Sequence, residues 1–221
     1  MAGIPVGVVV GGVGSRLAML ALRITSPDTV RGIESDDGFI IGRFTMSGSY
    51  SLMQLGAFVG VLGAVLYLLV RPWLVGPTCL RYLTVGLGCG AVVGSMLLHA
   101  DGVDFRVLEP SWFAMALFIA LPTVFGLTIG PAVDRTERRA IPSGWRQFTV
   151  PAALLAIGPG GLIPTVVLTP VIVLYAAVRL HRTSAPPHPA ARLAIRAAWL
   201  SVAVLGLLAV LGDIHAITRL S

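Results

Sequence analysis

Arg16 is the residue whose type and position could do chemistry, because it lies inside the first long apolar stretch of the chain. A charge at the centre of a bilayer costs several kcal/mol unless it is paired or reaches water. We expect Arg16 to face other helices and to pair with a carboxylate or with helix-end carbonyl groups. The nearest acids on the expected topology are Asp101, Asp104 and Glu109. An ion pair that only holds helices together would need the same arginine, so a functional and a structural role both stay open.

A second polar group, His99, Asp101 and Asp104, lies at the end of another apolar stretch. An imidazole and two carboxylates can together hold a divalent cation. The spacing of these residues matches no metal-binding motif, however, and acidic residues in loops are usually solvated. We therefore expect no metal site and no cofactor.

The sequence lacks the motifs of several common enzyme classes. It has no Gly-x-x-x-x-Gly-Lys phosphate loop, no His-Glu-x-x-His zinc motif and no Gly-x-Ser-x-Gly elbow. The two cysteines, Cys79 and Cys89, have no further Cys or His ligands at the spacing of a metal site. The sequence thus names no catalytic residue and favours a protein that is not an enzyme.

The elements that must position these residues are strongly apolar. Hydrophobic residues make up 56% of the chain and charged residues 12%, and the mean hydropathy is +0.88. A soluble domain is typically about a quarter charged, whereas a helix that crosses a bilayer needs about 20 apolar residues. We predict an all-α, polytopic transmembrane helical bundle that forms a single integral membrane domain over residues 1–221.

All 16 basic residues are arginines, and the formal net charge is +6. In a soluble protein such a charge would suggest a nucleic-acid partner. Here the arginines lie between apolar stretches, where Lys and Arg mark the cytoplasmic ends of spans. We therefore expect the partner to be the lipid bilayer and not nucleic acid.

Seven apolar stretches are candidates for spans. They are the stretches at about 4–24, 49–70, 82–98, 111–133, 148–162, 164–180 and 193–211. The region 148–180 is too long for one ordinary span, and the glycines and proline of Gly158–Gly161 interrupt it. Besides two short spans, this region could form one broken span or a re-entrant hairpin.

The arginine-rich segments 134–147 and 179–196 should both be cytoplasmic. The chain must then return between them, which requires an even number of crossings or a re-entrant hairpin. Seven spans satisfy this requirement in a cell (inner) membrane, with the N-terminus in the cytoplasm and the C-terminus outside. Six spans, with 179–196 outside, are the alternative.

The first exterior loop carries a turn signal. The segment Ser35–Gly38 ends in Asp-Gly and lies between Thr29–Val30 and Phe39–Ile41. An Asp-Gly pair between short apolar runs is typical of a β-hairpin. We expect a small exterior β-hairpin cap here, and an extended linker at 183–191, where prolines cluster.

Glycines spaced four residues apart mark four of the predicted spans. Such a spacing lines one face of a helix with small residues, so that another backbone can approach closely. We expect these glycines to pack helices within one bundle, although an exposed set could instead join two copies of the chain. They are Gly7, Gly11, Gly56, Gly60, Gly86, Gly90, Gly94, Gly126 and Gly130.

Three pieces of the chain carry a resemblance to a known group. They are Gly14–Arg16 in the Gly-rich first span, the exit of the second span at Leu68–Trp73, and the loop Asp104–Pro110 before the fourth span. Together they resemble uncharacterised multi-pass membrane proteins of high-GC bacteria, over about residues 5–135. The resemblance implies a membrane fold and brings no activity, ligand or catalytic residue with it.

Few polar groups lie within the apolar stretches, whereas a substrate pathway normally needs several. We therefore expect a non-enzymatic accessory or scaffold membrane subunit, for which a membrane-protein partner or a second copy of the chain is compatible. The alternative is a small transporter or channel with a pathway near Arg16 and the broken stretch Gly158–Gly161, because broken helices often line substrate sites.

Overall fold

The computed structural model describes residues 2–27, 32, 45–98, 110–139 and 189–220. Within these ranges the chain is helical and contains no β-strand, which confirms the predicted helical class. Five of the described segments are long and apolar enough to cross a membrane. They are Gly3–Thr25, Met46–Trp73, Thr78–Leu97, Ser111–Arg139 and Arg196–Arg219.

The described residues thus contain five candidate spans, and they do not support the predicted count of seven. The two further spans expected at 148–162 and 164–180, and with them the broken stretch Gly158–Gly161, lie outside the described residues. The β-hairpin expected around Ser35–Gly38 lies outside them as well.

The first span is one continuous rod made of three helical segments. It consists of α1 (Gly3–Val6), the π-helix η1 (Gly7–Val13) and α2 (Gly14–Thr25). It packs against α3 (Met46–Val70), whose start is capped by Thr45: the hydroxyl of Thr45 accepts a hydrogen bond from the backbone N–H of Gly48. Such a cap satisfies one of the N–H groups that a helix start leaves unpaired.

Glycines bring the first span and α3 into backbone contact. A Cβ at Gly7 would overlap the carbonyl oxygen of Gly56, and one at Gly60 would overlap that of Gly3. Gly11 lies against the same face, with its Cβ position 3.2 Å from the Cα atom of Gly56. Only residues without side chains fit here, and the close approach replaces side-chain packing with contact between backbones.

A second glycine interface joins α4 (Thr78–Leu97) to α6 (Ser111–Arg139). A Cβ at Gly126 would lie 2.8 Å from the Cα atom of Gly86, and one at Gly130 would lie 2.7 Å from the ring of Tyr82. Gly90 packs against the side chain of Thr123 of α6. Gly94, nearer the end of α4, makes ordinary van der Waals contacts with Ile119 and Val210.

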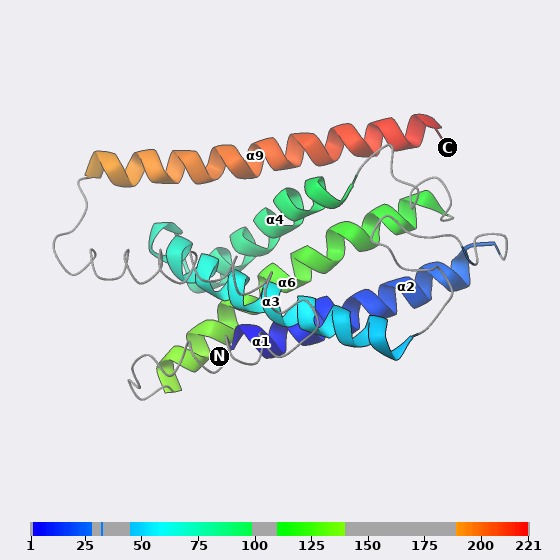
Figure 1. The fold of residues 1–221 in the computed structure, drawn as a ribbon. Helices are drawn as coiled ribbons and strands as arrows, with labels where there is room; N and C mark the ends of the chain where they lie inside the picture. The colour runs from blue at the N-terminus through cyan, green and yellow to red at the C-terminus, as the bar shows by residue number, and fades with distance from the viewer. Residues whose placement is uncertain (1, 28–31, 33–44, 99–109, 140–188, 221) are drawn as a thin grey trace.

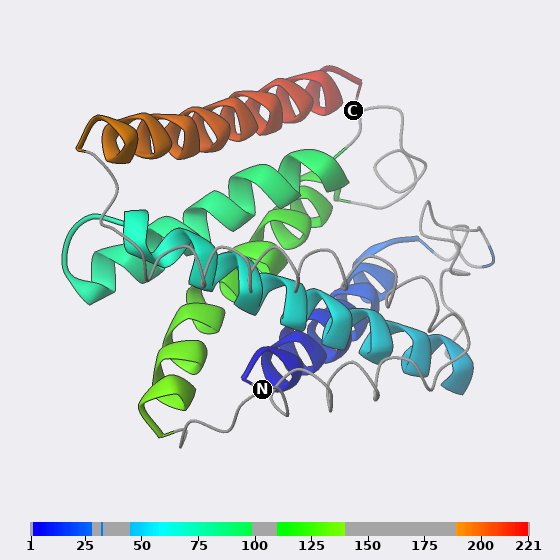
Figure 2. The same cartoon turned by 60° about the vertical axis from the view of Figure 1, so that its left-hand side comes forward.

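The last helix, α9 (Pro189–Leu220), lies along the outer side of α4 (Figure 1). Gly206 packs closely against α4, with a Cβ position 3.1 Å from the backbone of Ala91. Helix α6 lies between α4 and the pair formed by the first span and α3, and it bends along its length (Figure 2). The helix contains Pro122 and Pro131, and a proline removes a helical hydrogen bond and kinks the helix.

Two apolar clusters hold the two ends of the bundle. At the near end, where the N-terminus lies, Tyr67, Ile129 and Val133 are buried against residues of α1 and α4. At the far end, the end of α2, the end of α4, the start of α6 and the second half of α9 meet. The buried residues of that far cluster are Leu22, Leu98, Ala114, Met115, Val210 and Ile217.

Three boundaries differ from those predicted. Helix α4 begins at Thr78 rather than near residue 82, directly after Pro77. Helix α6 continues past residue 133 to Arg139, so that charged residues extend a helix that starts in an apolar stretch. Helix α9 spans 189–220 rather than 193–211, because Pro189 suits a first turn and Gly212, where the predicted span ended, costs a helix only about 1 kcal/mol. The end of the expected linker is thus helical.

Candidate functional site

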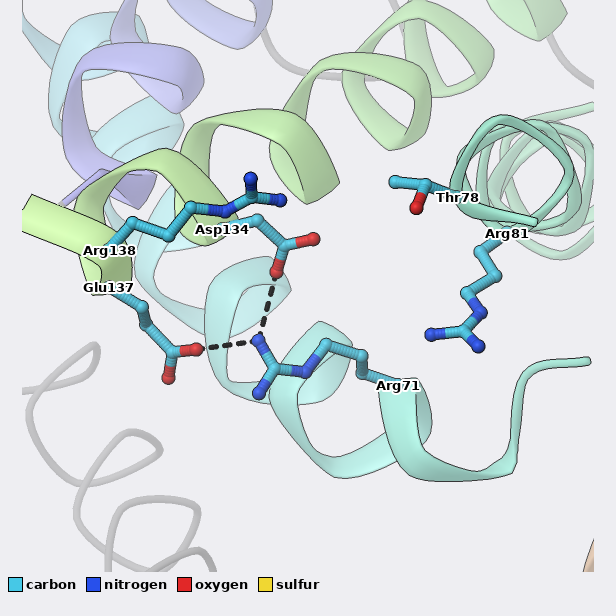
Figure 3. A pocket seen from close by; sticks show the side chains of 6 residues that line it. All are labelled: Arg71, Thr78, Arg81, Asp134, Glu137 and Arg138. Atoms are coloured by element: carbon cyan, nitrogen blue, oxygen red, sulfur yellow. Dashed lines mark hydrogen bonds and ion pairs between the residues drawn. The ribbon is translucent and has the colours of Figure 1, made fainter. Parts of the chain in front are cut away.

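A polar cluster lies at the near end of the bundle, where α3, α4 and α6 meet (Figure 3). Tyr67 and Arg71 are four residues apart, one turn from each other, at the end of α3 and the start of the short 3-10 helix η3 (Arg71–Trp73). Asp134 and Glu137 are three residues apart on α6 and share a face of that helix. The helix spacings therefore bring two polar side chains from each partner to the same place.

The carboxylate of Asp134 is the centre of this cluster. The hydroxyl groups of Tyr67 and Tyr82 both donate hydrogen bonds of 2.9 Å to its Oδ2 atom. Nη1 of Arg71 donates to the other oxygen, Oδ1, at 2.9 Å. Three helices thus share one acceptor group, and the side chain of Asp134 is 14% exposed. With both oxygens engaged by donors, Asp134 is placed to join helices rather than to accept a proton in catalysis.

Arg71 links the same carboxylate to a second one. Its Nη1 atom also donates to Oε2 of Glu137 (Figure 3). Arg71 and Glu137 are more exposed than Asp134, with 36% and 39% of their side chains accessible. The pair with Glu137 is therefore more strongly screened by solvent than the pair with Asp134.

The connection between α3 and α4 fixes the other wall of the cluster. Gly76 has a φ of +96°, a conformation that favours glycine, and Pro77 is the N-cap residue that precedes α4. The carbonyl oxygen of Gly76 accepts a hydrogen bond of 2.9 Å from Nε of Arg81. This short turn fixes the Nε atom of Arg81. The two terminal nitrogens of the guanidinium group are directed into the space beside Arg71 (Figure 3).

An open pocket of about 520 Å³ lies between these elements. Its lining residues are Arg71, Thr78, Arg81, Asp134, Glu137 and Arg138. The side chains of Arg81 and Arg138 reach it from α4 and α6 (Figure 3). Among the described residues, only Arg71 of these three arginines forms an ion pair, so the pocket offers two further cationic groups.

The residues singled out from the sequence do not lie in this pocket. Arg16 lies on α2, away from the pocket, and its Nε and Nη2 atoms are buried within the protein. His99, Asp101, Asp104 and Glu109 lie outside the described residues, so their expected pairing with Arg16 and their grouping stay predictions. Within the described ranges, no group of His, Cys, Asp and Glu could hold a metal ion.

The apolar pattern does not predict the Asp134 cluster, because it places Arg71, Asp134 and Glu137 in loops beyond the ends of the spans. Arg71, Arg81 and Arg138 served only as markers of the cytoplasmic side, and Asp134 was placed beyond the end of its span. The available signal was the pair of helical spacings, Tyr67 with Arg71 and Asp134 with Glu137. A basic residue at the end of one span and two acidic residues one turn apart at the end of another are compatible with an interhelical ion pair, although the spacing alone does not identify the partner helix.

The described residues that line the pocket include three arginines, whose N–H groups are donors suited to the oxygens of an anion. Comparisons of the chain with protein-family models, with curated proteins and with solved structures gave no match.

Proposed function

We propose that this protein is a multi-pass protein of the cell membrane that works as a non-enzymatic accessory or scaffold subunit, with its N-terminus in the cytoplasm. The observation that carries the proposal is the closed Asp134 cluster at one end of a glycine-packed bundle. Its polar groups bind one another and hold three helices together. A transport pathway, by contrast, needs polar groups that are directed into a route across the membrane.

The distribution of arginines supports the orientation. Near the end where the N-terminus lies, α3, α4, α6 and α9 place Arg71, Arg81, Arg135, Arg138, Arg139 and Arg196. The far end has Arg23 and Arg219 among the described residues. Arginines near span ends resist translocation, so the near end faces the cytoplasm.

The position of α9 agrees with this orientation. Nε of Arg196 donates a hydrogen bond of 3.3 Å to the carbonyl oxygen of Trp73, so α9 starts at the end where α6 finishes. The end of α6 and the start of α9 therefore lie at the same end of the described bundle.

The native Cys79 provides a direct test of orientation. It is exposed near the start of α4, whereas Cys89 is partly buried further along the same helix. In a Cys89→Ser background, a membrane-impermeant maleimide added to intact cells should leave Cys79 unlabelled and should label it after permeabilisation. Thr25→Cys, at the far end of the first span, should already be labelled in intact cells, in a background without Cys79 and Cys89. Labelling of Cys79 in intact cells would contradict the orientation.

A small transporter or channel is the second candidate, and Arg16 favours it. The arginine lies in the interior of the first span, one turn beyond the π-helix η1. Single-turn π-bulges occur frequently at functional sites, because they alter the backbone hydrogen bonding of a helix. A pathway along this face would have to contain water.

Thiol accessibility near Arg16 separates the two candidates. Met19→Cys lies on the face of α2 that carries Arg16, and Leu17→Cys is a control because Leu17 is 61% exposed and would face lipid. Since maleimide reacts with the thiolate, which forms in water, a scaffold predicts slow labelling at both positions. Fast labelling of Met19→Cys alone would indicate a water-filled pathway and would favour the transporter.

A further inference from the structure

The pocket at the near end has more positive than negative groups among its lining residues. Arg71, Arg81 and Arg138 face Asp134 and Glu137. Both carboxylates bind Arg71, so their charge is directed at one guanidinium group. Arg81 has a single hydrogen bond, from Nε to a backbone oxygen, and Arg138 has no ion pair among the described residues.

The two available guanidinium groups enter the pocket from different helices. Arg81 extends from α4 and Arg138 from α6, with the Arg71 side chain between them (Figure 3). Arginine presents pairs of N–H donors that match the oxygens of a phosphate group, and such bonds are about twice as strong as those between neutral groups. Two arginines on opposite walls can therefore bind one phosphate group from both sides.

The start of α4 adds to the positive character of the pocket. Thr78, the first residue of the helix, lines the pocket, and Pro77 before it provides no side-chain cap. The first N–H groups of a helix lack partners within the helix and bear a partial positive charge. This effect is secondary, since the arginines and the cavity itself provide the main attraction for an anion.

We propose that this pocket binds the phosphate group of an anionic ligand, with a phospholipid head group as the source that its position favours. The inference rests on the membrane location and orientation proposed above. Basic pockets between transmembrane helices at the cytoplasmic side are suited to anionic head groups. The volume of about 520 Å³ lies within the range of ligand pockets and accommodates a head group.

The carboxylates have a positioning role in this site. Asp134 and Glu137 hold Arg71 at one wall of the pocket and neutralise its charge. A second ligand oxygen must therefore bind to Arg81 or Arg138. The site consequently selects a single phosphate group over a ligand with several adjacent anionic groups, because those would approach the two carboxylates.

The test uses the full chain, purified in detergent, and native mass spectrometry with phosphatidylglycerol and phosphatidylcholine of identical acyl chains. We expect phosphatidylglycerol to bind about tenfold more tightly, because the quaternary ammonium group of phosphatidylcholine would place a positive charge beside Arg81 and Arg138. Arg81→Gln with Arg138→Gln should abolish this preference. Arg23→Gln with Arg219→Gln, the same loss of charge at the far end, should retain it.

Arg138→Gln alone guards against a folding defect, because Arg138 is exposed and makes no ion pair among the described residues. It should reduce the preference by severalfold in a protein that elutes normally. A parallel arm measures thermal unfolding with inorganic phosphate. A stabilisation by phosphate that needs Arg81 and Arg138, without a lipid preference, would support the phosphate site and assign its ligand to the soluble phase.

Equal binding of the two lipids together with no effect of phosphate overturns the inference, as does an equal loss in the far-end control. These outcomes, in a protein that needs detergent to stay folded, leave the proposed function intact. A chain that stays monodisperse and folded in plain buffer contradicts the membrane location itself, so the two failures can be told apart.

Discussion

Arg71 and Asp134 form an ion pair across the ends of α3 and α6, with Nη1 of the arginine 2.9 Å from Oδ1 of the aspartate. The two residues are separated by the whole of α4 and most of α6 in the sequence. The pair is strengthened by its surroundings, because the Asp134 side chain is only 14% exposed and also accepts hydrogen bonds from two tyrosines. It closes the near end of the bundle.

Asp134→Asn should lower the free energy of unfolding in detergent by about 1–3 kcal/mol, the range for removing a charged hydrogen-bonding partner from a buried group. The amide cannot form the ion pair with Arg71, and its NH₂ group cannot accept the hydrogen bonds that a carboxylate oxygen accepts. Thermal or denaturant unfolding followed by circular dichroism measures the change.

Glu137→Gln is the matched control for this substitution. It removes the other carboxylate that binds Arg71, but its side chain is 39% exposed. An exposed ion pair contributes about 0.2–1 kcal/mol, so the loss should be smaller than that for Asp134→Asn. Equal losses for the two variants would show that Asp134 is not the centre of the cluster.

The two tyrosines should act together. Each of Tyr67→Phe and Tyr82→Phe removes one hydroxyl group from Oδ2 of Asp134 and should cost about 1 kcal/mol. Because both hydroxyl groups bind the same atom, the double variant should depart from the sum of the two single losses by about 0.5 kcal/mol or more. Strict additivity in unfolding experiments would refute a shared acceptor.

Gly56→Ala should disrupt the contact between the first span and α3. The added methyl group would lie 2.5 Å from the carbonyl oxygen of Gly7 and 2.9 Å from the backbone nitrogen of Gly12. Both neighbours are backbone atoms and can yield only if the helices separate. Overpacking of this kind costs about 1–3 kcal/mol, which should lower the unfolding temperature in detergent.

Gly88→Ala provides the comparison, since nothing lies within 4 Å of the Cβ position at Gly88 in α4. Alanine is favoured over glycine in a helix by about 1 kcal/mol. The variant should therefore be as stable as the parent or more stable. A loss of stability equal to that of Gly56→Ala would contradict the assignment of the glycine contacts.

Gly206→Ile should detach α9 from α4. Carbon and oxygen atoms of the Ala91 backbone lie 3.1 Å from the Cβ position at Gly206, so a branched side chain would push the helices apart. Limited proteolysis should then cleave α9 faster, while the rest of the bundle resists. Gly212→Ile is the control because its Cβ position has no neighbour within 4 Å, and it should leave the cleavage rate unchanged.

The helical class and the approximate positions of the five described spans could be predicted because long apolar stretches depend only on local composition. The glycine spacing likewise indicated which faces could pack closely. It could not indicate the partner of each face, because Gly7 and Gly56, like Gly86 and Gly126, meet only through the tertiary arrangement.

The candidate site could not be predicted for a related reason. Asp134 acquires its role from Tyr67, Arg71 and Tyr82, which lie on two other helices. A composition-based boundary ended the span at residue 133, but helix α6 continues to Arg139. The shorter span leaves Asp134 and Glu137 outside the helix. Their three-residue helical spacing, which places both carboxylates beside Arg71, is then not recognised.

The lateral position of α9 bears on how the chain is made. The first span, α3, α4 and α6 already bury their glycine faces against one another, whereas α9 touches mainly the outer side of α4. Chains generally fold from the N-terminus during synthesis. We therefore expect α9 to dock last, as a separate step, onto a body that the preceding described helices have already formed.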